Sequence, residues 1–220
     1  MTKRMHTRGF LLLLAAICAA VALPVHASPA AVEGTDFRVI PSPQPTSSPG
    51  KIEVLEFFSY ACPHCNDFYP MVSTWAAKLP KDVVFNRVPV GFGRQAWVNL
   101  ARAYYSLKAS GDFDKLDGPL FRALHEEHLN LVDEGSLADW VGKQGGHADK
   151  FAGAYTSFGV NNDTERADEM VQSYTVDAVP TLAINGRYIV LGDSYTQILA
   201  NADKVLAMVR ANQAAPKSGK

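Results

Sequence analysis

The motif CPHC at residues 62–65 stands between an apolar run and a stretch of helical periodicity. The run at residues 52–58 reads as a strand, and the apolar spacing after the motif predicts a helix that ends at Pro80. This arrangement puts Cys62 at a helix N-terminus, where backbone amides and the helix dipole stabilise a thiolate. The only other cysteine, Cys18, lies in a segment that reads as a cleaved leader. A single CxxC pair of this kind indicates redox chemistry.

The N-terminal segment has the pattern of a secretory signal peptide. A basic start at residues 1–8 is followed by an uncharged run of 14 residues (10–23) and a small-residue ending at Ala27. The run is shorter than the roughly 20 residues that span a bilayer, so we expect cleavage after Ala27 and a periplasmic mature chain. A lipoprotein anchor at Cys18 is disfavoured, because Ile17 stands where acylation sites need a small residue.

Composition and cysteine spacing limit the kinds of partner and site. The net charge is −1, and loss of the three basic residues of the leader makes it −4, so no nucleic-acid partner is expected. Two cysteines this close in sequence cannot crosslink distant segments of the chain, which argues against a structural disulfide framework. A zinc site would need two more ligands; His125 and His128 could supply them, but an exposed helix face is the simpler interpretation. We expect neither a metal nor a cofactor.

The remaining chain reads as an α/β unit interrupted by helices. The first strand, helix and second strand form a βαβ unit, which is right-handed by default. The expected elements are an edge strand (36–40), a loop (41–50), a strand (51–58), a helix to Pro80, a parallel strand (83–88), helices from 95 to about 174, a hairpin turning at Asn185-Gly186 and a final helix spanning 198–209.

The change from strand to helical periodicity and back suggests domain boundaries. We expect a signal peptide at 1–27, a first part of the α/β domain with the CPHC motif at 28–94, a helical insertion at 95–166, a second part with the hairpin at 167–214, and a flexible tail at 215–220.

This organisation resembles the thioredoxin superfamily, and within it most closely the DsbA-type periplasmic thiol oxidases. The resemblance covers nearly all of the mature chain and depends chiefly on VLEFFSYACPHC (54–65), VPT (179–181) and NGRY (185–188). It implies a thioredoxin-like α/β fold with an inserted α-helical subdomain. The Pro-His pair inside the motif is of the DsbA type, whereas Pro70 resembles the helix-kinking proline of thioredoxin and implies a bent helix.

The motif residues have distinct expected roles. Cys62 is expected to be the exposed nucleophile of a redox-active disulfide, and Cys65, one helical turn on, the more buried resolving cysteine. His64 lies inside the motif, where its charge acts directly on the Cys62 thiolate. The start of the helix is sufficient to explain Pro63, since proline is favoured at the first helical position. Pro63 is also expected among the substrate-binding residues, because it lies next to Cys62.

Pro180 opens the first strand of the predicted hairpin, where proline is tolerated simply as a first strand residue. The resemblance implies instead that Pro180 is the cis-proline that packs against the disulfide in this superfamily. The Val179 backbone would then be free to pair with an extended substrate segment, and Val179 and Thr181 would flank that docking edge.

Glu56 is a carboxylate within an otherwise apolar strand, so it either points to a solvated edge or is buried with a raised pKa. The resemblance favours burial, because members of the superfamily carry an acid beneath the active site that takes the proton from the inner cysteine. Glu53, on the same strand, is expected to face solvent. Phe58, Tyr60, Phe68 and Tyr69 are interpreted as core or rim packing.

By resemblance, we expect a monomeric periplasmic dithiol oxidase that transfers its disulfide to unfolded, newly exported proteins. A membrane DsbB-type, quinone-linked oxidase would recycle it. A thiol reductase or isomerase is the main alternative; only 23 residues separate Ala27 from Lys51, too few for the dimerisation domain usual in such isomerases. A non-catalytic peptide-binding chaperone is a further alternative, whose activity would survive loss of both cysteines.

Overall fold

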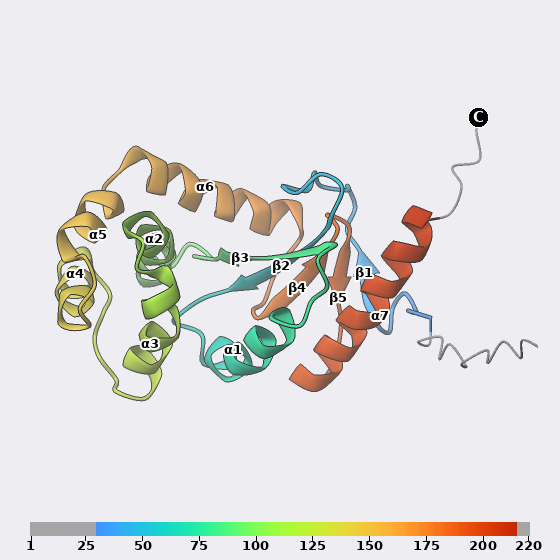
Figure 1. Cartoon of the computed structure of the whole chain (residues 1–220), viewed down its shortest axis with the longest axis horizontal. Coiled ribbons are helices and arrows are strands. Elements are labelled where there is room, and N and C mark those ends of the chain that lie inside the picture. The colour runs from blue at the N-terminus through green and yellow to red at the C-terminus, as the bar shows by residue number, and fades with distance from the viewer. Residues whose placement is uncertain (1–29, 215–220) are drawn as a thin grey trace, which may run out of the picture.

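The computed structural model describes residues 30–214, so the expected leader and the expected C-terminal tail lie outside the described residues. The strands form one mixed sheet with helices packed around it, and five consecutive helices separate the third strand from the fourth (Figure 1). In chain order they are β1 (Phe37–Val39), β2 (Ile52–Phe58), α1 (Pro63–Ala76), β3 (Val83–Pro89), α2 (Gln95–Ser110), α3 (Phe113–His125), α4 (Glu134–Lys143), α5 (Ala148–Tyr155), α6 (Phe158–Ser173), β4 (Thr181–Ile184), β5 (Tyr188–Val190) and α7 (Tyr195–Ala214).

The sheet has five strands in the order β1-β5-β4-β2-β3. Strand β2 pairs in parallel with β3 and antiparallel with β4, and β1 is an edge strand paired antiparallel with β5. All seven residues of β2 are buried, as a central strand covered on both faces requires. The predicted α/β fold with an inserted helical region between the strands is confirmed.

Helices cover both faces of the sheet, so successive β2 side chains enter different cores. Val54 packs with residues of α1 and α7 on one face. Leu55 and Phe57 pack with residues of α6 on the other face. The helices α2 to α5 gather beyond the carboxyl ends of β2 and β3, and Phe58 at the end of β2 joins their core (Figure 1). The CPHC segment therefore begins where the sheet meets the helical region.

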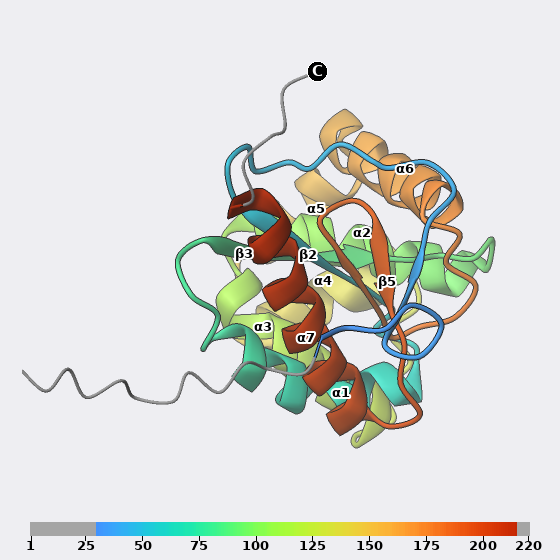
Figure 2. The same ribbon diagram turned by 90° about the vertical axis from the view of Figure 1, so that its right-hand side faces the viewer.

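The hairpin of β4 and β5 turns through Asn185 and Gly186, which have φ angles of 53° and 64°. Both lie in the left-handed region, as the predicted type I′ turn requires. The loop at residues 41–50 packs on this turn, where the Gln44 amide donates a 2.7 Å hydrogen bond to the Gly186 carbonyl. Figure 2 shows this loop, in blue, passing over the turn of the β4–β5 hairpin.

The same loop explains why the expectation for Glu53 is wrong. Glu53 is only 3% exposed, and its carboxylate accepts hydrogen bonds from the Ser47 backbone amide and hydroxyl and from the Asn86 amide. Because β2 is covered on both faces, a side chain that alternates away from α1 still meets protein rather than solvent. The loop and Asn86 of β3 together supply the donors that compensate the burial of this carboxylate.

The expectation of a shared helix face for His125 and His128 is also wrong. Helix α3 ends at His125, and His128 lies beyond it with a φ of 52°. Instead, the His125 ring is half-buried and its Nε2 lies 2.7 Å from the Tyr60 carbonyl oxygen. Across residues 30–214, no three His, Cys, Asp or Glu side chains gather as a metal site.

Helix α6 runs unbroken from Phe158 to Ser173 and so crosses the expected boundary at residue 166. Its start is capped by Ser157, whose hydroxyl accepts from the Val160 amide at 3.2 Å. One helix thus connects the inserted region with the sheet. In the stretch that the structure describes, no helix has the length and apolar character needed to cross a membrane.

Candidate active site

The CPHC motif forms the junction between β2 and α1. Cys62 is the N-cap residue of α1, with extended backbone angles, and Pro63 occupies the first turn, where its missing amide costs no hydrogen bond. The Cys62 carbonyl accepts from the amides of Cys65 and Asn66, both at 3.1 Å. Pro70 lies inside α1 and removes the amide that would donate to the Asn66 carbonyl, a local weakening of the helix.

Both thiols are free in this structure, and both are largely covered. Cys65 is 0% exposed, whereas Cys62 retains 5%. The expected order of exposure is therefore present, but Cys62 is less exposed than its position at a helix end suggested. Val179 lies over it, and the Cys62 thiol donates to the Val179 carbonyl at 3.5 Å.

The two thiols differ strongly in acidity. The pKa of Cys62 is lowered to about 6, first because the Cys65 thiol donates to its sulfur, and then because the backbone amides of Cys65 and His64 and the His64 charge stabilise the thiolate; burial opposes this shift. Burial raises the pKa of Cys65 far above its usual range, and its hydrogen bond to Cys62 adds to that effect. At neutral pH the reduced pair therefore holds one thiolate, on Cys62, and one proton, on Cys65.

The His64 ring is exposed, and its Nδ1 lies 3.3 Å from the hydroxyl of Tyr195 at the start of α7. Tyr195 in turn packs against Phe68 of α1, with ring centroids 5.3 Å apart. Sequence analysis missed Tyr195, because an aromatic residue at the start of a helix carries no local sign that it meets the motif.

The segment from Val179 to Thr181 lies beside the motif, as expected. The Val179–Pro180 peptide bond is cis, and both residues are half-buried. Thr181 begins β4 opposite Phe57 of the central strand, and its hydroxyl donates to the Ala178 carbonyl at 2.8 Å. The sheet pairing therefore fixes this segment next to the cysteines.

Glu56 is buried beneath the motif, with an exposed fraction of 0%. Its Oε2 accepts from Nε of Arg87 at 2.7 Å, and Arg87 also donates through Nη1 to Asp117 at 2.9 and 3.0 Å. Burial raises the Glu56 pKa, despite the Arg87 charge, and the Glu56 charge in turn helps to raise the pKa of Cys65. Of the two interpretations of Glu56, the structure supports burial.

Sequence analysis missed Arg87 and Asp117 around the motif, and it assigned His125 to an exposed helix face. A signal for Arg87 was available, because a charged residue inside a predicted strand beside the Glu56 strand suggests an ion pair; the two are partners in the parallel register. Asp117 comes from α3, and only tertiary packing brings it to this pair.

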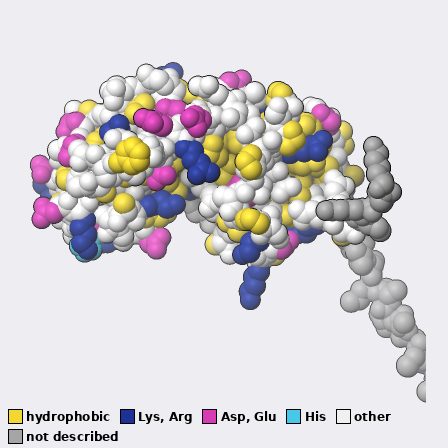
Figure 3. All heavy atoms as spheres, turned by 90° about the horizontal axis from the view of Figure 1, so that it is seen from above, with side chains coloured by type: hydrophobic (Ala, Val, Ile, Leu, Met, Phe, Trp, Pro, Cys, Tyr) yellow, Lys and Arg dark blue, Asp and Glu magenta, His cyan; other side chains and the backbone are white. Residues whose placement is uncertain are grey.

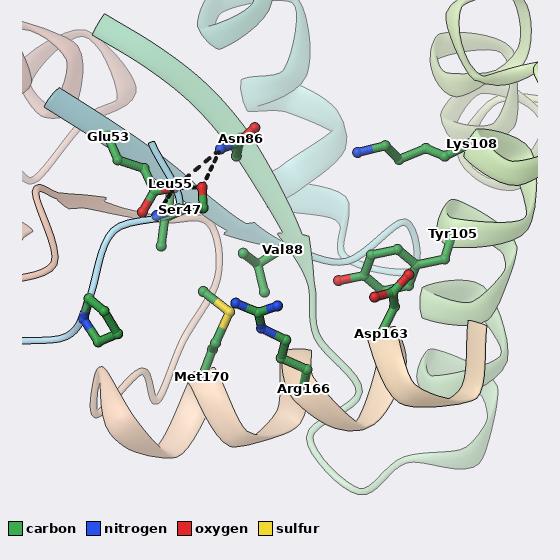
Figure 4. A pocket seen from close by; sticks show the side chains of 11 residues that line it. Ser47, Glu53, Leu55, Asn86, Val88, Tyr105, Lys108, Asp163, Arg166 and Met170 are labelled. Atoms are coloured by element: carbon green, nitrogen blue, oxygen red, sulfur yellow. Dashed lines mark hydrogen bonds between the residues drawn. The ribbon is translucent and has the colours of Figure 1, made fainter. Parts of the chain in front are cut away.

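A separate hollow lies on the α6 face of the sheet and includes no CPHC residue. Glu53 and Asn86 line one side, Met170 and Arg166 of α6 another, and Tyr105 and Lys108 of α2 a third (Figure 4). Figure 3 shows acidic, basic and hydrophobic side chains intermixed on this face of the described chain, without a broad basic patch.

Two neighbouring thiols that differ this much in acidity can exchange with an external disulfide or dithiol, and on a thioredoxin-like sheet they define a thiol:disulfide oxidoreductase. The family profile described as DSBA-like thioredoxin domain matches residues 53–202. The chain belongs to this DsbA family.

Similar proteins span nearly the same length. The thiol:disulfide interchange protein DsbA of Burkholderia cepacia is 38% identical over 182 residues, which are 82% of this chain and 85% of that protein. DsbA of Bordetella parapertussis is 37% identical, over 90% of this chain and 96% of its own. The crystal structure of Pseudomonas aeruginosa DsbA superposes with a TM-score of 0.78 at 34% identity, covering 82% of this chain and 95% of that chain. For the Xylella fastidiosa oxidoreductase DsbA, the TM-score is 0.77 at 32% identity, covering 82% and 98%.

Proposed function

We propose that the protein acts in the oxidising direction and transfers the Cys62–Cys65 disulfide to other proteins. The observation that carries this proposal is the low pKa of Cys62, about 6. An interaction that stabilises the Cys62 thiolate stabilises the reduced form, and this raises the reduction potential of the pair. The same thiolate is a good leaving group when the mixed disulfide with a substrate is resolved.

The transfer takes two displacements. A substrate thiolate attacks the Cys62 sulfur, the Cys62–Cys65 bond breaks, and Cys65 leaves with the electron pair and takes up a proton. A second substrate thiolate then attacks the substrate sulfur of the mixed disulfide, and Cys62 leaves as a thiolate. The substrate dithiol loses two electrons and gains a disulfide, and the CPHC pair becomes the reduced form.

Glu56 is proposed as the group that exchanges a proton with Cys65. Its burial next to Arg87 and the effect of its charge on Cys65 support this role. A carboxyl group with a raised pKa is suited to proton transfer near neutral pH. His64 is proposed as a secondary tuning group, because its charge lowers the Cys62 pKa less than the Cys65 thiol and the backbone amides do.

Substrates are proposed to dock as extended segments along Val179, Pro180 and Thr181, next to Pro63. The 3.5 Å approach of the Val179 carbonyl to the Cys62 sulfur supports this, because a chain lying along that backbone would bring a cysteine to the reactive sulfur. Backbone hydrogen bonds would give affinity without a fixed sequence, as unfolded substrates require.

The relatives carry the name thiol:disulfide interchange protein. We propose a monomer that acts in the periplasm on unfolded or reduced exported proteins and is reoxidised by a membrane DsbB-type, quinone-linked oxidase. The signal-peptide pattern of the first 27 residues supports export.

The reduction potential of the Cys62/Cys65 pair, measured at equilibrium with glutathione, tests the direction. We expect the pair to be mostly reduced in a glutathione mixture that leaves an unfolded peptide with the same CPHC sequence mostly oxidised. A potential at or below that of the unfolded peptide would support the reductase alternative. A difference of about 30 mV corresponds to a tenfold change in the equilibrium constant for two electrons.

A further inference from the structure

One buried guanidinium forms ion pairs with two carboxylates beneath the motif. Arg87 of β3 lies between Glu56 of β2 and Asp117 of α3, the second of the inserted helices. The Arg87 guanidinium also lies 3.6 Å from the centroid of the Phe58 ring, which leaves little room for water on that side. The chemistry of Glu56 therefore depends on how Arg87 is shared with Asp117.

The sharing is unequal. Asp117 accepts from Arg87 Nη1 through both oxygens and from the hydroxyl of Tyr60. Glu56 accepts from Nε alone. Among the described residues, neither Glu56 Oε1 nor Arg87 Nη2 has a hydrogen-bond partner, and these two atoms would complete a side-on bidentate pair. Glu56 is thus the less compensated of the two carboxylates.

With both carboxylates ionised, the cluster carries a net charge of −1 in a site where burial makes an unpaired charge costly. A proton entering the cluster goes to the carboxylate with fewer donors, Glu56. Burial raises the Glu56 pKa, and the Asp117 charge raises it further. Besides Arg87 on β3 and Asp117 on α3, the titratable groups around Glu56 are Cys65 and Tyr69 on α1, Tyr60 after β2 and Tyr104 on α2.

We propose that Asp117 is a positioning residue for thiol exchange: its carboxylate holds Arg87 through Nη1, so the one positive charge is shared between two carboxylates and Glu56 stays able to exchange a proton with Cys65. The inference rests on the proposed role of Glu56. When Cys65 leaves as a thiolate, the Glu56 O–H bond breaks and the Cys65 S–H bond forms. During reoxidation the proton returns to Glu56, and no electrons accompany it. The inserted helices thereby take part in the chemistry of the motif.

Release of glutathione from a mixed disulfide at Cys62 isolates this proton transfer, because Cys65 must lose its proton to displace it. The first-order release rate is measured against pH by rapid mixing. In the wild-type protein, we expect an inflection at the pKa of Glu56. Glu56→Gln should remove the inflection; if the Glu56→Gln profile equals that of the wild type, Glu56 is not the proton acceptor and the inference fails with it.

Asp117→Asn keeps the shape of the side chain and removes its charge, so Glu56 is left as the only carboxylate that compensates the Arg87 charge. We expect the inflection to move to lower pH by about one unit, which corresponds to a tenfold lower affinity of Glu56 for its proton. An inflection that stays at the wild-type pH in Asp117→Asn, while Glu56→Gln abolishes it, would overturn the role of Asp117 alone. If Asp117→Asn does not fold, Asp117→Ser provides the same loss of charge with a smaller side chain.

Asp112→Asn is the matched control. Asp112 precedes the same helix and is similarly buried, at 4% exposed against 7% for Asp117, but it bonds to Ser110 and His147 rather than to Arg87. We expect Asp112→Asn to lower the stability of α3 and leave the inflection in place. An equal displacement in both variants would show that destabilising α3 is sufficient and would overturn the proposal.

Discussion

The sulfur of Cys62 lies 3.5 Å from the backbone carbonyl oxygen of Val179, although 117 residues separate the two in sequence. The antiparallel pairing of β4 with β2 brings them together, since Thr181 lies opposite Phe57, which is five residues before Cys62. The reactive sulfur is therefore next to backbone that can dock a peptide, and Cys65 lies behind it without exposure.

This arrangement predicts which cysteine forms the substrate complex. Cys65→Ala should accumulate mixed disulfides with reduced substrate proteins, because an incoming thiolate reaches Cys62 and no internal thiol remains to release the substrate. Cys62→Ala should accumulate few, since Cys65 is fully buried. Non-reducing gels followed by mass spectrometry of the linked peptides check this. Complexes linked mainly through Cys65 would reverse the assignment.

The acidity of Cys62 predicts the pH dependence of the reduction potential. Below about pH 6 reduction takes up two protons, and above it one, because Cys62 is then a thiolate while Cys65 keeps its proton. The potential should fall by about 59 mV per pH unit below the break and by about 30 mV above it. Equilibration with glutathione between pH 5 and 8 measures the slope; a single slope through this range would contradict the low pKa.

The separate contributions to the Cys62 pKa predict a ranking of variants. Cys65→Ala removes the largest contribution, the thiol that donates to the Cys62 sulfur, and should raise the pKa by on the order of one unit. His64→Ala keeps the backbone amide and removes only the ring charge, so its effect should be smaller. Thiolate absorbance near 240 nm during pH titration measures both. A larger effect of His64→Ala would make the imidazole the dominant stabiliser.

Local sequence patterns predicted the sheet, the hairpin and the junction that holds the motif, but they did not distinguish two carboxylates on one strand. Glu56 and Glu53 both lie in an apolar run, and only Glu56 was expected to be buried. Glu53 is buried because the loop at residues 41–50 folds over it and donates from Ser47. Composition identifies that segment as a loop without indicating what it covers.

Local sequence patterns did not predict which residues of other helices and strands contact the site. Asp117 lies on α3, 30 residues after Arg87, and apolar periodicity predicts that helix without indicating which polar side chain meets the ion pair. Tyr195 meets His64 across 131 residues for the same reason. The cysteines could be predicted because their chemistry depends on close spacing in sequence, whereas these contacts depend on packing alone.

The hairpin turn provides a prediction for stability alone. Gly186 has a φ of 64°, and a Cβ at this position would lie 2.0 Å from the Gln44 carbonyl oxygen. Gly186→Ala should therefore displace the loop at residues 41–50 and destabilise the protein by about 2 kcal/mol or more. Denaturant unfolding measures the loss. Gly153→Ala, at a helical position with open space around the added carbon, is the control and should not destabilise the protein.

The opposite pKa shifts of the two cysteines predict how the stability of the reduced protein changes with pH. The folded pKa of Cys62 is about 6, below the usual value near 8.5, and that of Cys65 is far above it. Between pH 6 and 8.5 the unfolded chain binds two thiol protons and the folded chain one, so the contribution of the thiols to stability rises with pH. Above pH 8.5 the unfolded chain binds none while folded Cys65 keeps its proton, so the contribution falls again.

The oxidised protein has no thiols, which makes it the reference for this prediction. The difference in unfolding free energy between the reduced and oxidised forms should be flat below pH 6, increase in favour of the reduced form by about 1.4 kcal/mol per pH unit up to pH 8.5, and decline above it. Denaturant unfolding of both forms at matched pH values measures this difference. A difference that stays constant from pH 5 to 10 would mean that neither thiol is perturbed in the folded protein, and the argument for an oxidising pair would lose its basis.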